Sequence, residues 1–220
     1  MRVVIAGGHG KIAVLTERLL ADRGDSVAGF IRNPDHAADL EAAGAEPIVV
    51  DLESSSADEV AGHLTGADAV IFAAGAGPGS GAARKQTVDH DAAVLLADAA
   101  EAAGVRRYVM VSAMAADSAA PDDAGDEVFV TYLRAKGAAD DNIRARDGLQ
   151  STIVRPGRLT DDPAAGKVAA GTDTGYGSIP RADVAAVLVA VLDAPQTAGL
   201  TFDVISGDTG ITEAVAGLGD

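Results

Sequence analysis

Tyr132 and Lys136 are spaced for acid–base chemistry. In a helix, residues four apart lie one turn apart on the same face, which would bring the lysine ammonium close to the phenol. A nearby positive charge favours the phenolate, lowers the pKa of the tyrosine and makes it a usable general acid or base. Ser112 ends an apolar segment and could add a hydroxyl to the same site. These three residues are the predicted catalytic group; the alternative is an exposed tyrosine beside a solvated lysine.

A glycine turn near the N-terminus is the second candidate site. Gly7, Gly10 and Ala13 have the spacing G-x-x-G-x-x-A of the dinucleotide fingerprint, between a short apolar segment and a helical pattern. Gly7 can adopt the positive φ of a sharp turn, Gly10 has no Cβ to hold a pyrophosphate away, and Ala13 lets the helix pack closely. The helix N-terminus offers free N–H groups and a positive dipole end. The alternative is a turn that merely joins a strand to a helix. We predict that the cofactor contacts here come from Gly7, His9, Gly10, Lys11 and Ile12.

Arg32 bears on which dinucleotide would bind. It follows the second apolar segment, and it is the only ionised residue of that turn before Asp35. An acidic residue at this point accepts the ribose hydroxyls of NAD, whereas an arginine can pair with the 2′-phosphate of NADP. The guanidinium fits a phosphate in bidentate fashion, so the sequence favours NADP over NAD. A solvated arginine at a strand end is the alternative.

Two further groups of cofactor contacts are predicted after the third and fourth apolar segments. Asp51 could accept the adenine amino group, with Leu52 beside it, or it could simply cap a turn. Ala73, Ala74 and Gly75 are small enough for their backbone to approach a cofactor closely, or they form only a tight turn.

The elements that must position these residues alternate along the chain. The predicted strands are residues 3–6, 27–31, 47–50, 69–73, 108–112, 152–154 and 201–205. The predicted helices are residues 11–22, 35–43, 57–64, 84–103, 126–146 and 182–192, and residues 75–83 are predicted to form a flexible loop. This alternation predicts an α/β fold with a doubly wound parallel sheet, a Rossmann fold, in which ligands bind at the carboxyl ends of the strands. We expect a single domain over residues 1–220, with residues 156–220 contributing a small substrate-side cap.

Composition excludes several classes of function. The 33 acidic residues against 17 basic ones give a net charge of −16, which disfavours nonspecific nucleic-acid binding. Either a surface hydrated in high salt or a basic partner would explain this charge, and its even dispersal favours the former. Cysteine is absent, and no histidine pair has zinc-site spacing, so no disulfide and no metal site are predicted. No apolar run reaches the length of a membrane span, about 18 residues, and no signal-peptide pattern is seen, so a cytoplasmic protein is expected.

The motifs together resemble the short-chain dehydrogenase/reductase superfamily, and most closely its atypical NAD(P)H-binding, epimerase/dehydratase-like branch. They are Gly-Gly-His-Gly-Lys-Ile-Ala, Phe-Ala-Ala-Gly-Ala-Gly, Val-Asp-His-Asp, Arg-Arg-Tyr-Val-Met-Val-Ser, Tyr-Leu-Arg-Ala-Lys, Thr-Ile-Val-Arg-Pro-Gly and Ile-Pro-Arg-Ala-Asp-Val-Ala. The resemblance implies strand order 3-2-1-4-5-6-7. It also implies that Tyr132 is the general acid/base, that Lys136 contacts the cofactor ribose, that Ser112 polarises the reacting group, and that Pro156 and Gly157 line the nicotinamide pocket.

The resemblance predicts an NADP-dependent oxidoreductase that acts on a small carbonyl or hydroxyl compound, as a monomer or homodimer. Two alternatives stay open: an epimerase or dehydratase that uses NAD(P) transiently, and a non-catalytic protein that senses NADP(H). Phe72 departs from the asparagine that many superfamily members carry, and the chain is short after the sixth strand. Both features weaken the case for a sugar epimerase. The sequence does not identify the substrate.

Overall fold

Parallel strands form the centre of the structure, a computed structural model that describes residues 1–77 and 79–219. In chain order these strands are β1 (Arg2–Ala6), β2 (Ser26–Ile31), β3 (Glu46–Val49), β4 (Ala69–Phe72), β5 (Arg107–Val111), β6 (Gln150–Pro156) and β10 (Thr201–Ser206). They lie side by side as β3-β2-β1-β4-β5-β6-β10, with every adjacent pair parallel. The predicted α/β fold and the order 3-2-1-4-5-6-7 are therefore confirmed.

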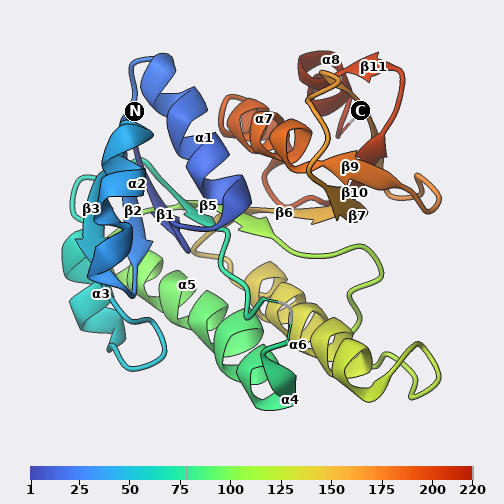
Figure 1. Cartoon of the computed structure of the whole chain (residues 1–220), viewed down its shortest axis with the longest axis horizontal. Coiled ribbons are helices and arrows are strands. Elements are labelled where there is room, and N and C mark those ends of the chain that lie inside the picture. The colour runs from blue at the N-terminus through green and yellow to red at the C-terminus, as the bar shows by residue number, and fades with distance from the viewer. Residues whose placement is uncertain (78, 220) are drawn as a thin grey trace.

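Helices cover both faces of this sheet (Figure 1). One face carries α1 (Lys11–Asp22), α2 (Ala37–Ala42) and α7 (Arg181–Leu192). The other carries α3 (Ala57–His63), α5 (Ala92–Ala102) and α6 (Glu127–Arg144). Shorter helical segments join them: η1 (Pro34–His36), α4 (Gly81–Arg84), η2 (Lys85–Asp91), η3 (Pro195–Thr197) and α8 (Ile211–Ala216).

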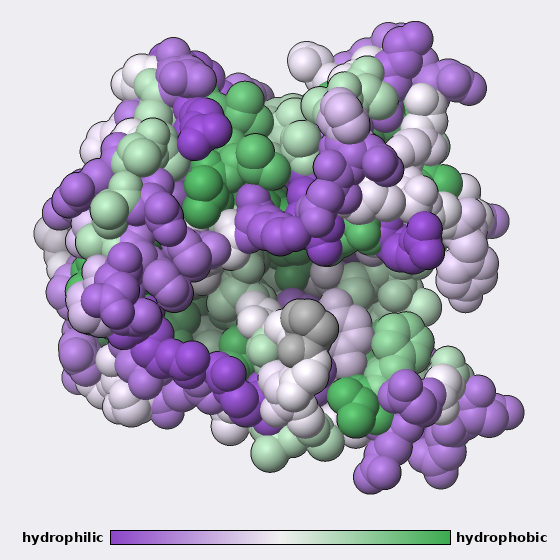
Figure 2. Space-filling view, in the orientation of Figure 1, coloured by the Kyte–Doolittle hydropathy of each residue, from purple (hydrophilic) through white to green (hydrophobic). Residues whose placement is uncertain are grey.

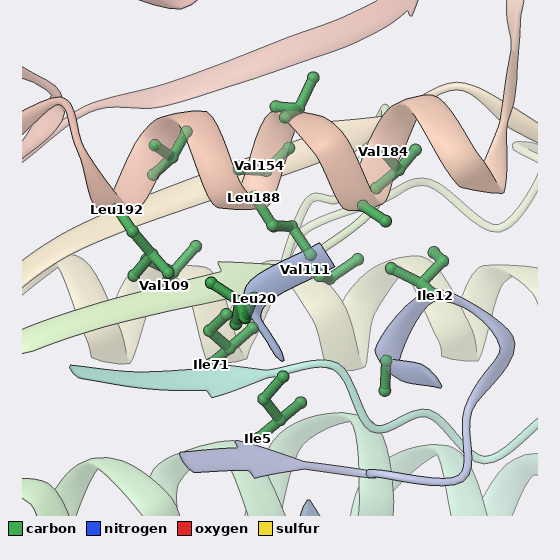
Figure 3. Packing of buried hydrophobic residues seen from close by; sticks show 14 of the residues in the cluster. Ile5, Ile12, Leu20, Ile71, Val109, Val111, Val154, Val184, Leu188 and Leu192 are labelled. Carbon is green, nitrogen blue, oxygen red and sulfur yellow. The ribbon is translucent and has the colours of Figure 1, made fainter. Parts of the chain in front are cut away.

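Each central strand buries both of its faces, which is typical of parallel sheets between helix layers. In β1, Val3 and Ile5 join the core under α1 and α7, whereas Val4 and Ala6 join the core on the opposite face. Figure 3 shows the first core, which contains strand residues such as Ile71 of β4 and helix residues such as Leu188 of α7. Full burial of each such side chain stabilises the fold by about 1.5–3 kcal/mol. This double burial is why the strands appear in the sequence as apolar runs.

The predicted helix over residues 84–103 is only partly correct. Its first part, η2, is a π-helical segment that continues directly from α4 and into α5. The expected loop over residues 75–83 is shorter than predicted, because α4 already begins at Gly81. A π-helical segment shifts side chains relative to the regular helical period, so the 3.6-residue pattern could not place Lys85 and Asp89 correctly.

The residues that follow Pro156 have several roles in the fold. Two antiparallel strands, β8 (Lys167–Gly171) and β11 (Thr209–Gly210), extend the main sheet beyond β10. A separate two-stranded parallel sheet, β7 (Arg158–Thr160) with β9 (Ser178–Pro180), lies beyond the carboxyl end of β6. The sequence did not predict these four strands or α8, because segments of only two to six residues are too short for an apolar period to show. No helix in the described part of the chain combines the length and the apolarity needed to cross a membrane.

Candidate functional site

The turn between β1 and α1 has the geometry of an anion site. Gly7 has a φ of +82°, and a Cβ at this position would lie 2.6 Å from the Cα of Ala74, so the turn requires glycine. Gly10 donates its N–H to the carbonyl of Gly7 at 2.8 Å and precedes the helix in an extended conformation. The first turn of α1, all of it described, has neither a side-chain cap nor an acidic residue. Its N–H groups are therefore suited to a phosphate.

A cavity of about 280 Å³ opens beside this turn, between the ends of β2, β3 and β4. The structure brings together here most of the residues predicted to bind the cofactor: Gly7, His9, Gly10, Arg32, Asp51, Leu52, Ala73, Ala74 and Gly75. The ring of His9 stacks on His36 with centroids 3.6 Å apart, and its Nε2 lies 2.7 Å from Asp39.

Two predicted cofactor residues point their side chains elsewhere. The ammonium of Lys11 binds Asp161 at 2.6 Å, and the side chain of Ile12 is buried in the core under α7. Lys11 and Ile12 would therefore contact a ligand at the turn only through their backbone N–H groups. Asp51 accepts the N–H of Glu53 at 3.1 Å, so the turn-capping alternative describes part of its role.

An ionic cluster that the sequence did not predict surrounds Arg32. Arg32 and Arg84 both donate to the same oxygen of Glu53, each at 2.8 Å, and Thr87 donates to the other oxygen at 2.7 Å. The Thr87 hydroxyl and the Arg84 guanidinium hold the pKa of Glu53 below its ordinary value. Arg84 comes from α4 and Glu53 from the loop after β3, so only the fold brings them to Arg32. Both guanidinium groups line the first cavity, with one carboxylate between them.

The predicted catalytic and nicotinamide-side residues, except Lys136, line a second, larger cavity of about 1150 Å³. Ser112, Tyr132, Pro156 and Gly157 all contribute to its wall, at the carboxyl ends of β5 and β6 and on α6. The Ser112 hydroxyl is buried beside the carboxylate of Asp140, and its hydrogen bonding to that carboxylate opposes the rise that burial causes in the pKa of Asp140. Figure 2 shows this face of the molecule hollowed across its middle, with hydrophobic residues inside and hydrophilic residues along the rim.

Lys136 lies behind this wall and lines neither cavity. Its ammonium donates to the carbonyl of Val111 at 3.1 Å and lies 3.4 Å from Oδ1 of Asp89. The ring of Phe72, which stands where many superfamily members have asparagine, has its centroid 5.5 Å from the same ammonium. The positive charge of Lys136 is thus already balanced inside the protein.

The expected lowering of the Tyr132 pKa by Lys136 is wrong. Burial raises the pKa of Tyr132 above its ordinary value, and the nearby carboxylates Asp89 and Asp140 raise it further. The phenol is therefore protonated throughout the physiological range. The cation that does face the ring is Lys85, whose ammonium lies 5.3 Å from the ring centroid.

The π-helical segment η2 also holds the loop that follows β4. Lys85 donates to the carbonyl of Gly77 at 2.9 Å, and Asp89 accepts the N–H of Ala76 at 3.3 Å. Both side chains are buried. One segment therefore connects the loop of the first cavity with the tyrosine of the second. Neither spacing nor composition points to Lys85 or Asp89 in the sequence, although Val-Asp-His-Asp belongs to the family pattern.

Comparison with known proteins agrees with this arrangement. The sequence profile of the NAD(P)H-binding family matches residues 7–195, from the glycine turn to beyond the end of α7. The chain belongs to this family. Membership confirms the resemblance drawn from the motifs, and it supports a site for NAD(P)H without choosing between the two dinucleotides.

Several relatives match this family member over nearly its whole length. A Bacillus subtilis (strain 168) protein named as an uncharacterized sugar epimerase, YhfK, is 39% identical over 99% of this chain and all of its own. A Bacillus halodurans structure, named as a candidate NAD-dependent epimerase/dehydratase, is 35% identical with a TM-score of 0.89, covering 99% of this chain and all of its own. ChuY, an anaerobillin reductase from Escherichia coli O157:H7, is 25% identical with a TM-score of 0.79, covering 94% of this chain and 98% of its own.

Proposed function

We propose that the protein is an NADP-dependent oxidoreductase that reduces a carbonyl group of a small molecule. The observation that carries this proposal is the position of Ser112 and Tyr132, whose side chains line one cavity at the carboxyl edge of the sheet. The glycine turn with its own cavity lies at the same edge. Two hydroxyl groups next to a dinucleotide site can bind the reacting oxygen and transfer a proton to it when a hydride is transferred.

The residues of the first cavity fit a bound NADP. The N-terminus of α1 and the turn from Gly7 to Gly10 would hold the pyrophosphate through backbone N–H groups. Arg32 and Arg84 would bind the 2′-phosphate, because two guanidinium groups that now share one carboxylate can exchange it for a dianion. This pair is the reason to propose NADP rather than NAD.

The residues of the second cavity would handle the proton. A bound nicotinamide would supply the hydride. The Ser112 hydroxyl would turn from the Asp140 carboxylate to donate a hydrogen bond to the substrate carbonyl oxygen. Tyr132 would give its proton to that oxygen; because its raised pKa makes the phenol a weak acid, this transfer would depend on the alkoxide formed by hydride addition being the stronger base. Lys85, with its ammonium over the ring, would then stabilise the phenolate that remains.

An epimerase or dehydratase is the second candidate, favoured by the names of the two Bacillus relatives. Such an enzyme would use the cofactor transiently, so product would form without net consumption of NADPH. In the cavity wall, apolar side chains such as Met114, Leu133 and Leu159 outnumber the side chains that can hydrogen-bond, which suits a mainly apolar substrate better than a sugar. Following NADPH and product together in one assay separates the two candidates.

The Tyr132→Phe variant tests the proposal. Against a panel of carbonyl compounds, we expect wild-type turnover with NADPH, and a loss of about 10²- to 10⁴-fold in the variant, as for a lost general acid. Binding of NADPH, followed by calorimetry, should stay nearly intact. Tyr176→Phe is the matched control, because Tyr176 lines the same cavity but is 90% exposed at its rim. Full turnover by Tyr132→Phe would rule out this mechanism, and tight NADPH binding without turnover on the panel would favour a sensor.

A further inference from the structure

The charges around the second cavity are the reverse of those of the chain as a whole. The chain carries a net charge of −16, yet the charged residues that line the cavity are Arg158, Arg181 and Asp117. Asp117 accepts the N–H of Ala119 at 2.8 Å and so caps its own turn. The cavity wall therefore carries two guanidinium groups and one carboxylate, in a chain whose net charge is strongly negative.

The two arginines of the cavity differ in their ion pairs. Arg181 donates to Asp161 at 2.7 Å, and the same carboxylate binds Lys11 beside the glycine turn. Arg158 is exposed and makes no ion pair with any described residue. It belongs to β7 and follows Pro156 and Gly157 of the cavity wall directly. Arg158 is thus the cation at this cavity that a ligand can use.

The rest of the cavity is suited to an apolar body. Most of the wall is apolar, and Tyr176 stands at its rim with 90% of its surface exposed. An aromatic ring so exposed gains stabilisation when a ligand covers it.

We propose that the second cavity binds an amphipathic anion, a molecule with an apolar body and a carboxylate or phosphate group, and that Arg158 binds the acidic group. A guanidinium binds both groups in bidentate fashion, which fixes the orientation of the ligand as well as its position. In a chain of net charge −16, local positive charge also helps to attract an anion. This inference rests on the proposed function, because the reacting carbonyl would then lie toward Ser112 and Tyr132.

A pair of fluorescent probes tests the inference without a known substrate. Anilinonaphthalene sulfonate has an apolar body and an anionic group, whereas phenylnaphthylamine has the same ring system and no charge. We expect Arg158→Gln to weaken binding of the sulfonate probe by about tenfold or more, and to leave the neutral probe unchanged. Arg18→Gln, which removes an exposed arginine of α1 outside both cavities, is the matched control and should change neither.

Two further measurements locate the probes and identify the acidic group. Met114→Trp narrows the cavity and should weaken both probes, which places them in it. Naphthoate and naphthyl phosphate should displace the sulfonate probe from the wild type better than naphthol does, and this advantage should vanish in Arg158→Gln. The stronger of the two anions then shows which acidic group the cavity prefers.

Three results would overturn the inference: sulfonate-probe binding unchanged in Arg158→Gln, an equal loss for both probes, or displacement by naphthol as effective as by the anions. A loss of NADPH affinity in Arg158→Gln would also overturn it, since the arginine would then serve the cofactor. Failure of the proposed function is distinguishable, because it would show as absent NADPH binding by the wild type or as full turnover by Tyr132→Phe.

Discussion

The ammonium of Lys136 lies 3.4 Å from Oδ1 of Asp89, and both side chains are buried between α6 and the π-helical segment η2. This ion pair sits directly behind the cavity that Tyr132 lines. Asp89 also accepts the N–H of Ala76 in the loop after β4. One buried pair therefore links the helix of the proposed acid to the loop of the proposed cofactor site.

Breaking this pair should destabilise the protein. We expect Lys136→Met to lower the free energy of unfolding by about 3–5 kcal/mol, because it leaves a buried carboxylate without its partner. Asp89→Asn should also lower the free energy of unfolding, because it leaves the buried ammonium of Lys136 without its carboxylate. The double variant should recover much of the loss. Urea unfolding of the four proteins measures this coupling. Strictly additive losses would show that the two residues do not act as a pair.

Arg32 and Arg84 should set the preference for NADPH over NADH. Replacing either by alanine should cost about 1.5–3 kcal/mol of NADPH binding, the range for a hydrogen bond to a charged group, with NADH binding little changed. Glu53→Gln should act in the opposite direction, because it removes the carboxylate that competes for both guanidinium groups. Calorimetric titration with both dinucleotides checks this. An unchanged ratio in both arginine variants would mean that the phosphate binds elsewhere.

Glu17 should make the stability fall with rising pH. Its carboxyl is buried on α1 over Gly8 and Gly29, and neither oxygen has a hydrogen-bond partner among the described residues. Burial raises the pKa of Glu17 from 4.5 to about 8. Between these values the folded protein holds a proton that the unfolded chain has lost, so the contribution of Glu17 to stability is fully present below pH 4.5 and falls until about pH 8.

The Glu17→Gln variant isolates this effect. The contribution of Glu17 amounts to about 1.4 kcal/mol per pH unit at most, and the variant should lack it. Urea unfolding at a series of pH values should therefore show that the free energy of unfolding of Glu17→Gln rises relative to that of the wild type as the pH increases toward 8. Glu41→Gln, on the exposed surface of α2, should show no such gain. A constant difference between Glu17→Gln and the wild type across the series would contradict the assigned pKa.

Gly7→Ala should damage both folding and cofactor binding. Alanine at a positive φ costs about 1–2 kcal/mol, and here its Cβ would also overlap with Ala74. Gly24→Ala is the control, because Gly24 has a φ of +90° and a Cβ at this position would have no neighbouring heavy atom within 4 Å. We expect Gly24→Ala to lower the free energy of unfolding only by the cost of alanine at a positive φ, and to bind NADPH normally. Equal unfolding free energies and equal NADPH affinities for the two variants would show that the turn tolerates a side chain.

The sequence by itself determined the features that depend on local pattern. Apolar runs separated by helical periods predicted the parallel strands, because strands buried on both faces must be apolar throughout. The glycine turn was predictable because a positive φ at Gly7 is a local property of the chain. Ser112 was placed at the carboxyl edge of the sheet because it ends a strand, whereas the positions of Tyr132, Pro156 and Gly157 around the same cavity were implied by the resemblance to the family.

Only the tertiary structure decided the electrostatics of the site. Glu53 lies 21 residues from Arg32 and 31 from Arg84, and nothing local to any of them reveals that they share an oxygen. The protonation of Tyr132 was predicted in the wrong direction from Lys136, its neighbour on the helix. The pKa of a buried group depends on every charge that the fold brings near it and on the loss of water, and here burial, Asp89 and Asp140 outweigh the residue one turn away.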